Sequence, residues 1–218
     1  MLDNIKAVIF DLDGTLIDSM HVWDKVDIDF LQKRGKEVPE DLFSDLPSGD
    51  GLLPMAIYFK KKFDLPENTQ TIIAEWNSMA LDFYSSLDLI KGAENLLNKL
   101  LNKNIKLGIG TSNSEVLTEA VLKYNQIRDI FQSVVTGCSI SRGKPFPDIY
   151  LTVASELDIP PENCLVVEDT VHGVEAAKNA GMKVIAIYND YSKKDEEILK
   201  EKADAFIYNY SELDSLLF

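Results

Sequence analysis

The 218-residue sequence has little cysteine and little histidine, two residues of each. Cys138 and Cys164 form no CxxC pair, which argues against a disulfide framework and a zinc site. His21 and His172 do not follow strand-like segments, and no Ser–His pair stands out. These absences argue against thiol, zinc and serine–histidine chemistry and leave carboxylates as the conspicuous reactive groups.

Positive charge is also scarce: 22 Lys and Arg face 36 Asp and Glu, a net charge of −14. Nucleic acids and anionic membranes bind basic surfaces, so neither is an expected partner. No apolar run approaches the length of a membrane span, and the N-terminal one is too short for a signal peptide. We therefore expect a cytoplasmic protein, and a monomer because no exposed apolar stripe is evident.

Short apolar runs rich in Val and Ile recur along the chain. Such runs are typical of strands buried on both faces of a parallel sheet. Helical patterns lie between them, and Gly181 has the position of a helix C-cap. The alternation predicts an α/β fold with a doubly wound parallel sheet. The predicted strands are 6–10, 105–110, 133–137, 164–169, 183–188 and 204–208, and the helices are 93–104, 115–124, 147–158 and 171–181.

One region interrupts this alternation with helices alone. Segments 20–35, 51–63 and 69–86 carry helical spacing of apolar residues and no strand pattern. We expect residues 18–87 to form a helical domain inserted after the first strand, above the carboxyl edge of the sheet. Residues 1–17 and 88–218 then form the α/β core.

The conspicuous polar residues follow predicted strands. Because the carboxyl ends of parallel strands meet at one edge of a sheet, these side chains should converge there. That convergence is a stronger signal than any single residue. The residues are Asp11, Asp13, Thr111, Ser112, Asn113, Lys144, Glu168 and Asp169.

Four of these residues are acids, and like charges held together need a cation. Asp11, Asp13, Glu168 and Asp169 offer the hard oxygen ligands that Mg²⁺ prefers. The alternative is structural: Asp13 starts a turn with Gly14, and Glu168 with Asp169 caps the following helix. Two such coincidences at the ends of apolar strands favour the metal site.

The remaining residues suit an anion. Thr111 and Ser112 offer hydroxyl groups, and with Asn113 they precede a helix N-terminus, which attracts phosphate. A helix-capping box with Glu115 is the alternative. Lys144 stands beside two prolines that stiffen its loop, which favours a buried counter-charge over a solvated lysine. Carboxylates, a lysine, a divalent cation and an anion cradle together predict phosphoryl transfer.

A carboxylate can itself be the nucleophile and form an aspartyl-phosphate. Asp11, directly after the strand, is then the attacking group. Asp13 lies two residues on, protonates the leaving oxygen and later accepts a proton from the hydrolytic water. The flexible Gly14 lets the chain turn away from this segment.

These motifs resemble the haloacid dehalogenase superfamily of phosphohydrolases, in its β-phosphoglucomutase-like branch. The family motif D-x-D-G-T stands here as "DLDGTLIDS" from Asp11, and the second motif is Thr111 in "GIGTSN". The third is Lys144 in "GKPFPDIY", and the fourth is the acidic pair in "VVEDTVHGVEAAKNAG". All four occur in order across essentially the whole chain.

The resemblance implies a small helical cap over a Rossmann-like core and Mg²⁺ as cofactor. It implies that Asp11, the Asp13 carbonyl and Asp169 bind the metal, with Glu168 nearby as a further acid. Thr111 and Lys144 would hold the phosphate. The implied activity is hydrolysis of a small phosphate monoester of a sugar, polyol or nucleoside, so the expected partner is a small phosphorylated metabolite.

The same branch contains sugar phosphomutases, which remain an alternative. A mutase is expected to carry a cap histidine where Trp23 stands here, two residues after His21, and a cap arginine in a loop that lacks one, residues 44–53. Thr15 of the "DGT" motif also favours a phosphatase over a mutase. A second alternative is a non-enzymatic signalling domain that is phosphorylated on Asp. A dehalogenase is a weaker alternative, because its reaction has no use for the second Asp. Trp23 and residues 48–52 are the expected specificity determinants.

Overall fold

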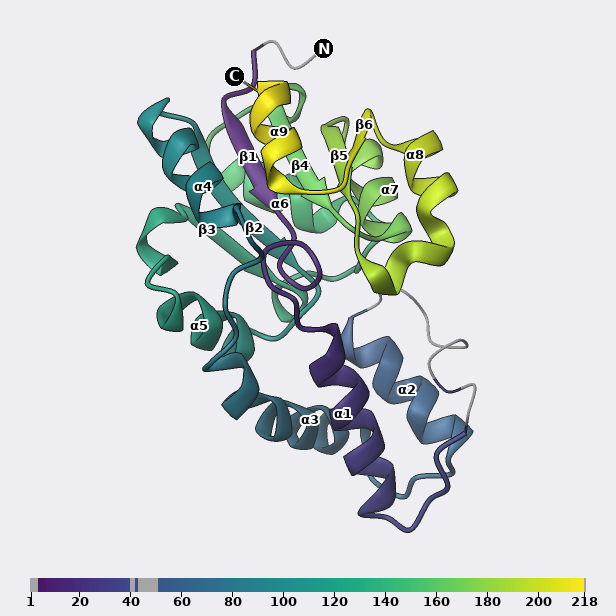
Figure 1. The fold of residues 1–218 in the computed structure, drawn as a ribbon. Helices are drawn as coiled ribbons and strands as arrows, with labels where there is room; N and C mark the ends of the chain where they lie inside the picture. Colours follow the sequence, from purple (N-terminus) through teal and green to yellow (C-terminus); the bar gives the residue numbers. More distant parts are fainter. Residues whose placement is uncertain (1–3, 40–41, 43–50, 218) are drawn as a thin grey trace.

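The computed structural model describes residues 4–39, 42 and 51–217. Within them, six parallel strands form one sheet in the order β3-β2-β1-β4-β5-β6 (Figure 1). The first strand is therefore central, with β2 on one side and β4 on the other. The strands are β1 (Ala7–Phe10), β2 (Lys106–Thr111), β3 (Ser133–Thr136), β4 (Cys164–Glu168), β5 (Lys183–Ile187) and β6 (Ala205–Ile207).

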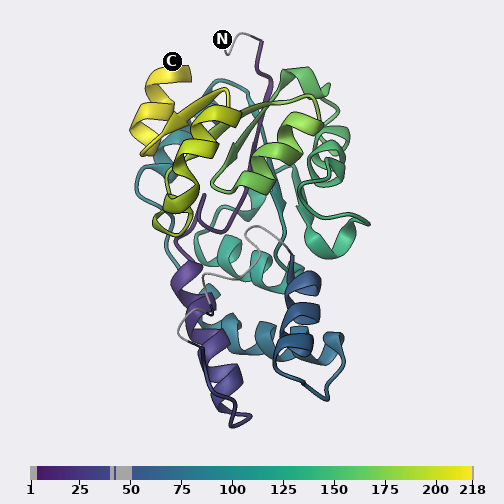
Figure 2. The same cartoon turned by 90° about the vertical axis from the view of Figure 1, so that its right-hand side faces the viewer.

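Helices cover both faces of the sheet, as Figure 2 shows from the side. Alternate residues of β1 point to opposite faces: Val8 and Phe10 belong to one apolar cluster, and Ala7 and Ile9 to the other. The first cluster includes residues of α4, α5 and α9, and the second includes residues of α6, α7 and α8. These helices are α4 (Ala93–Asn102), α5 (Glu115–Tyr124), α6 (Asp148–Glu156), α7 (Val171–Asn179), α8 (Glu196–Lys202) and α9 (Tyr210–Leu217).

The predicted doubly wound parallel sheet is confirmed. Each predicted strand and each predicted helix of the core has a counterpart within two residues of its bounds. Gly181 follows the end of α7 with a φ of +74°, as expected for a residue that ends a helix. Sequence patterns did not predict α8 and α9. None of the described helices is both long and apolar enough to cross a membrane.

Three helices, α1 (Met20–Gln32), α2 (Leu52–Lys62) and α3 (Thr69–Tyr84), follow β1 and form what we call the helical unit. In Figure 1 this unit lies beyond the carboxyl ends of β1 and β2. Its helices pack around an aromatic cluster in which the Trp76 ring lies 5.5 Å from Phe30 and 5.1 Å from Phe59. Edge-to-face packing of this kind adds to the stability gained by burial.

The two chain segments that join the helical unit to the sheet lie side by side. Ile17 forms an antiparallel bridge with Leu89, and the Ile90 N–H donates to the Leu16 carbonyl oxygen at 2.8 Å. The outgoing and returning chain are thereby held together close to the end of β1.

Strand register brings the ends of β1, β2 and β4 to one level. Phe10, the last residue of β1, pairs with Ile109 of β2 and with Val167 of β4. Asp11 and Glu168 therefore start from neighbouring positions, and the Asp11 N–H donates to the Val167 carbonyl oxygen at 3.0 Å. The strand order also reverses at β1, where open parallel sheets bind their ligands.

Gly108 of β2 offers a test of how tightly α6 packs on the sheet. A Cβ at this position would lie 2.4 Å from Val153 Cγ1 and 3.3 Å from Leu157 Cδ1. We expect Gly108→Ala to lower the free energy of unfolding by about 1–3 kcal/mol, because the core must move to accept the methyl group.

The matched control is Gly143→Ala, since nothing lies within 4 Å of a Cβ there. Urea unfolding monitored by circular dichroism compares the two variants. Equal stabilities would show that α6 is packed more loosely than the structure indicates.

Candidate active site

The side chains of Asp11, Lys144 and Glu168 meet at the carboxyl end of the sheet. Lys144 Nζ lies 2.6 Å from Asp11 Oδ1 and 2.6 Å from Glu168 Oε1. The Lys144 residue is only 5% exposed, as the prediction of a buried counter-charge requires. One ammonium group therefore faces two carboxyl groups, and such buried charges are tolerated only when they are paired.

Glu168 is fixed by the start of α7. Its Oε2 accepts hydrogen bonds from the N–H groups of Asp169 and Thr170, both at 2.7 Å. Thr170, not the acidic pair, caps the helix, because its Oγ1 accepts from the Gly173 N–H. A Cβ on Gly173 would lie 1.7 Å from Glu168 Oε1. The helix end and the glycine together orient the Glu168 side chain toward Lys144.

Asp169 is positioned by the loop that follows Asp13. Thr15 Oγ1 donates to Asp169 Oδ1 at 3.2 Å. Gly14 has a φ of +76°, and a Cβ there would lie 2.2 Å from Asp169 Oδ2. The loop is held from the other side by Asn189, whose Nδ2 donates to the Gly14 carbonyl oxygen at 3.1 Å. A glycine at position 14 is thus needed both for the turn and because a side chain would prevent the loop from lying so close to Asp169.

Asp13 faces a different set of groups, which come from the start of the inserted region, from the helical unit and from the loop after β2. Its Oδ1 accepts hydrogen bonds from Ser19 Oγ and Tyr84 OH, and its Oδ2 from Asn113 Nδ2 at 2.8 Å. Trp23 Nε1 donates to the Tyr84 oxygen at 2.9 Å. Burial and the adjacent Asp13 raise the pKa of Tyr84 well above its usual value, so the phenol remains a donor.

The loop after β2 contains the predicted anion-binding residues. Thr111 Oγ1 accepts from the Asn113 N–H at 3.1 Å, and Asn113 Oδ1 accepts from the Ser114 N–H at 2.7 Å. Ser114 precedes α5 but does not cap it; its Oγ donates to Asn77 of α3 instead. The capping-box alternative is therefore wrong. Thr111, Ser112 and Asn113 all line the same cavity as Asp11.

The site carries more negative than positive charge. Burial raises the pKa of Asp11 to about 8; Lys144 lowers it, and Glu168 and Asp13 raise it. Burial, with repulsion from Glu168 and Asp11, raises the pKa of Asp169 well above its usual range. The acids therefore lack compensating charge, and hard oxygen donors with excess negative charge fit a divalent cation.

No ready-made cage for that cation exists among the described residues, since no three acidic, histidine or cysteine side chains are arranged as metal ligands there. Mg²⁺ does not need such a cage, because it usually binds one or two carboxylates and completes its shell with waters and substrate phosphate. Asp11 and Asp169 fit this role, as both line the cavity.

The cavity at the site has a volume of about 220 Å³ and lies between the sheet and the helical unit. Its wall on the sheet side carries all eight of the predicted polar residues. The helical unit contributes a mainly apolar wall that includes acidic side chains. The described residues of that wall are Met20, Trp23, Asp24, Asp27, Gly51, Leu52, Met55 and Trp76.

Several of these contacts were not predicted from the sequence. Ser19 and Tyr84 carried no local signal for a role at Asp13. Tyr150, whose OH donates to Glu168 Oε1 at 3.2 Å, looked like an ordinary helix residue. Of the predicted specificity determinants, Trp23 and Leu52 line the cavity. Positions 43–50 lie outside the described residues.

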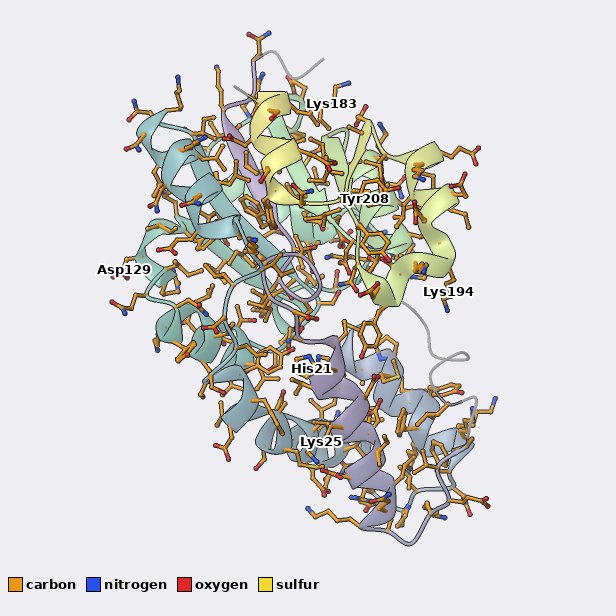
Figure 3. The ribbon with its side chains drawn as sticks, in the orientation of Figure 1. His21, Lys25, Asp129, Lys183, Lys194 and Tyr208 are labelled. Atoms are coloured by element: carbon orange, nitrogen blue, oxygen red, sulfur yellow. The ribbon has the colours of Figure 1, made fainter. Side chains whose placement is uncertain are left out.

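Neither histidine belongs to the described lining of the cavity. His21 is exposed on the first turn of α1, and Figure 3 shows it at the boundary between the helical unit and the sheet. Lys194 lies across this boundary, just before α8, and does line the cavity (Figure 3). A Lys194 contribution was not predicted.

Comparisons with known proteins agree with this fold and site. The model of the family described as haloacid dehalogenase-like hydrolase matches residues 8–187. β-Phosphoglucomutase of Bacillus subtilis is 32% identical over 196 residues, which cover 84% of this chain and 83% of that protein. A phosphorylated carbohydrates phosphatase of Thermotoga maritima is 32% identical over 184 residues, covering 83% and 84%.

Among solved structures, CbbY from Rhodobacter sphaeroides in complex with phosphate superposes with a TM-score of 0.87 at 26% identity, over 96% of both chains. The fold is thus that of an α/β hydrolytic core with an acidic site at the end of its first strand. The chain belongs to the family of haloacid dehalogenase-like hydrolases. The resemblance seen in the four sequence motifs is confirmed.

Lys144 provides a test of the charge balance. We expect Lys144→Met to lower the free energy of unfolding by about 3–5 kcal/mol, because it leaves Asp11 and Glu168 buried without their counter-charge. Chemical denaturation at neutral pH measures the loss. In an Asp11→Asn background the same substitution should cost less, since one carboxylate has already been removed.

Lys178→Met is the control, because Lys178 pairs with Asp204 at 3.0 Å while its side chain is 42% exposed. Exposed pairs contribute less than about 1 kcal/mol. A loss no larger in Lys144→Met than in the control would contradict the proposed charge balance.

Proposed function

We propose that the protein is a Mg²⁺-dependent phosphatase that hydrolyses a small phosphate monoester through an aspartyl-phosphate on Asp11. The observation that carries this proposal is the contact between Asp11 and the buried Lys144 at the floor of the cavity between the sheet and the helical unit. A nucleophilic carboxylate needs an adjacent positive charge both to remain ionised and to receive an anionic phosphate.

In the first step, an Asp11 oxygen attacks phosphorus and the bond from phosphorus to the ester oxygen breaks. Asp13 gives its proton to the departing oxygen. In the second step, Asp13 takes a proton from water, and the water oxygen attacks phosphorus. The bond from phosphorus to Asp11 then breaks and releases inorganic phosphate.

Other residues hold the phosphoryl group during both steps. Lys144 supplies positive charge, and Thr111, Ser112 and Asn113 supply hydroxyl and amide groups at the end of β2. Asp11, the Asp13 carbonyl and Asp169 would hold Mg²⁺. When bound, the ion neutralises charge on the acids and on the phosphate oxygens.

Residues 18–87, which contain the helical unit, would act as a cap over the site. Gly51 at the start of α2 approaches Ser112 of the core: a Cβ on Gly51 would lie 3.4 Å from the Ser112 carbonyl oxygen. Tyr84 of the unit donates a hydrogen bond to Asp13, and Trp23 donates one to Tyr84. A cap in this position keeps bulk water from the site while Asp11 is phosphorylated.

A sugar phosphomutase is the second candidate, and one relative is named β-phosphoglucomutase. A mutase must hold a bisphosphate whose distal phosphate needs cations on the cap side. Among the described residues, the helical unit places no lysine or arginine in the cavity wall. This favours the phosphatase, which would release phosphate from a sugar monophosphate without a bisphosphate activator.

A phospho-accepting signalling domain is the remaining alternative. A signalling site must admit the phosphate donor and then be read by a partner on the surface. Here Asp11 is 6% exposed and lines a cavity of about 220 Å³ between the sheet and the helical unit. A cavity of this kind beside the phosphate site favours an enzyme with a small organic substrate.

The nucleophile is tested by Asp11→Asn. We expect this variant to lose turnover of p-nitrophenyl phosphate by at least about 10³-fold, because an amide cannot replace the carboxylate as nucleophile. Release of p-nitrophenol is the readout. Asp129→Asn is the control, since Asp129 is exposed and lies on the outer edge of the core (Figure 3). Wild-type turnover by Asp11→Asn would refute the assignment.

Metal dependence is tested by chelation. Dialysis against EDTA should abolish turnover, and added Mg²⁺ should restore it, because the acids of the site lack compensating charge. Mg²⁺ should also raise the melting temperature of the wild type more than that of Asp169→Asn, since binding to the folded state stabilises it. Full activity in metal-free buffer, or equal shifts for both proteins, would argue against this site.

A further inference from the structure

Asp27 is a buried acid that the proposed chemistry does not use. It lies on α1, one helical turn after Trp23, and is 6% exposed. The residue lines the same cavity as Asp11, but on the wall that the helical unit provides. A carboxyl group is costly to bury, so its presence in this wall calls for a function.

The Asp27 carboxyl group has no hydrogen-bond partner among the described residues. Burial, with a smaller repulsion from Asp24, raises its pKa to about 8, and no hydrogen bond offsets this rise. The Asp27 oxygens are not among the fully buried side-chain oxygens that lack a partner. They are therefore accessible from the cavity that Asp27 lines. Near neutral pH a carboxyl group in this state can donate as well as accept a hydrogen bond.

The surroundings of Asp27 narrow what it could bind. Trp23, Leu52, Met55 and Trp76 make the wall beside it mainly apolar. The other acid of this wall, Asp24, already accepts a hydrogen bond from Tyr191 OH at 2.7 Å. Trp76 Nε1 also lacks a hydrogen-bond partner, but it is fully buried, so Asp27 is the acidic group of this wall that is available to a ligand.

Positive charge lies elsewhere in the cavity. Among its described lining residues, Lys144 and Lys194 are the cations, and both belong to the sheet side. Lys144 is committed to Asp11 and Glu168, and Lys194 is exposed. A second phosphate or a carboxylate near Asp27 would therefore find no lysine or arginine among the described residues of this wall to pair with, and burying an unpaired anion is unfavourable.

We infer that Asp27 determines specificity by hydrogen-bonding hydroxyl groups of the substrate, which is a short polyol or sugar monophosphate without a second anionic group. The inference rests on the proposed phosphatase function and specifies its substrate class. The phosphate binds at Asp11 and Lys144, and the hydroxylated chain extends towards α1. A cavity of about 220 Å³ is smaller than the usual pocket for a drug-sized ligand, which suits so small a molecule.

The test compares kcat/KM for sorbitol 6-phosphate with kcat/KM for p-nitrophenyl phosphate, which has no hydroxyl groups. In Asp27→Leu this selectivity ratio should fall by about 10- to 100-fold, mainly through KM for sorbitol 6-phosphate, because one or two buried hydrogen bonds are lost. Asp27→Asn keeps a polar amide and should recover most of the ratio. Asp27→Ala serves as a second apolar variant if the leucine variant does not fold.

Asp29→Asn is the control, because Asp29 lies on the same helix, pairs with Lys25 and has a 43% exposed side chain. Its selectivity ratio should match that of the wild type. The apolar Asp27 variants should also melt at or above the wild-type temperature, as expected when a partnerless buried acid is removed.

An unchanged ratio in both apolar variants would overturn the inference. So would a wild-type preference for fructose 1,6-bisphosphate or phosphoglycolate over sorbitol 6-phosphate, since both carry a second anionic group. Wild-type protein with no activity on any of these esters would overturn the proposed function and the inference together. Activity combined with an unchanged ratio would overturn the inference alone.

Discussion

The structure depends on one lysine held among several buried acids. Lys144 lies 2.6 Å from both Asp11 and Glu168, and Asp169 completes a group with more negative than positive charge. Such a group is stable only when each member is fixed by other contacts. Backbone amides fix Glu168, Thr15 binds Asp169, and a strand end fixes Asp11.

Sheet topology explains how residues so far apart in the sequence come together. β1 is central, and its neighbours β2 and β4 end at the same level. One edge of the sheet therefore collects the residues that follow three adjacent strands, and the loop after β3 adds Lys144. The helical unit lies over this edge and supplies the opposite wall of the cavity, so two parts of the chain line one site.

The sheet and the sheet-side residues could be predicted because their signals are local. Apolar runs mark buried strands, and the polar residue that ends each run is visible beside it. The contacts made by the helical unit could not be predicted in this way. Tyr84 reaches Asp13 across 71 residues of sequence, and Asp27 reads as one more charge on an amphipathic helix. Their positions beside Asp13 and in the cavity wall arise only from tertiary packing, for which sequence periodicity contains no information.

The pairing of Ile17 with Leu89 has a mechanical consequence. The chain passes between the sheet and the helical unit along two segments that are tied together at one place. Any rotation of the helical unit relative to the sheet would therefore pivot about these two paired segments, immediately beside Asp13. Such a rotation would carry the far wall of the cavity away from the sheet and would break the hydrogen bond between Tyr84 and Asp13, whereas the contacts of Lys144 with Asp11 and Glu168 lie within the core and would stay in place.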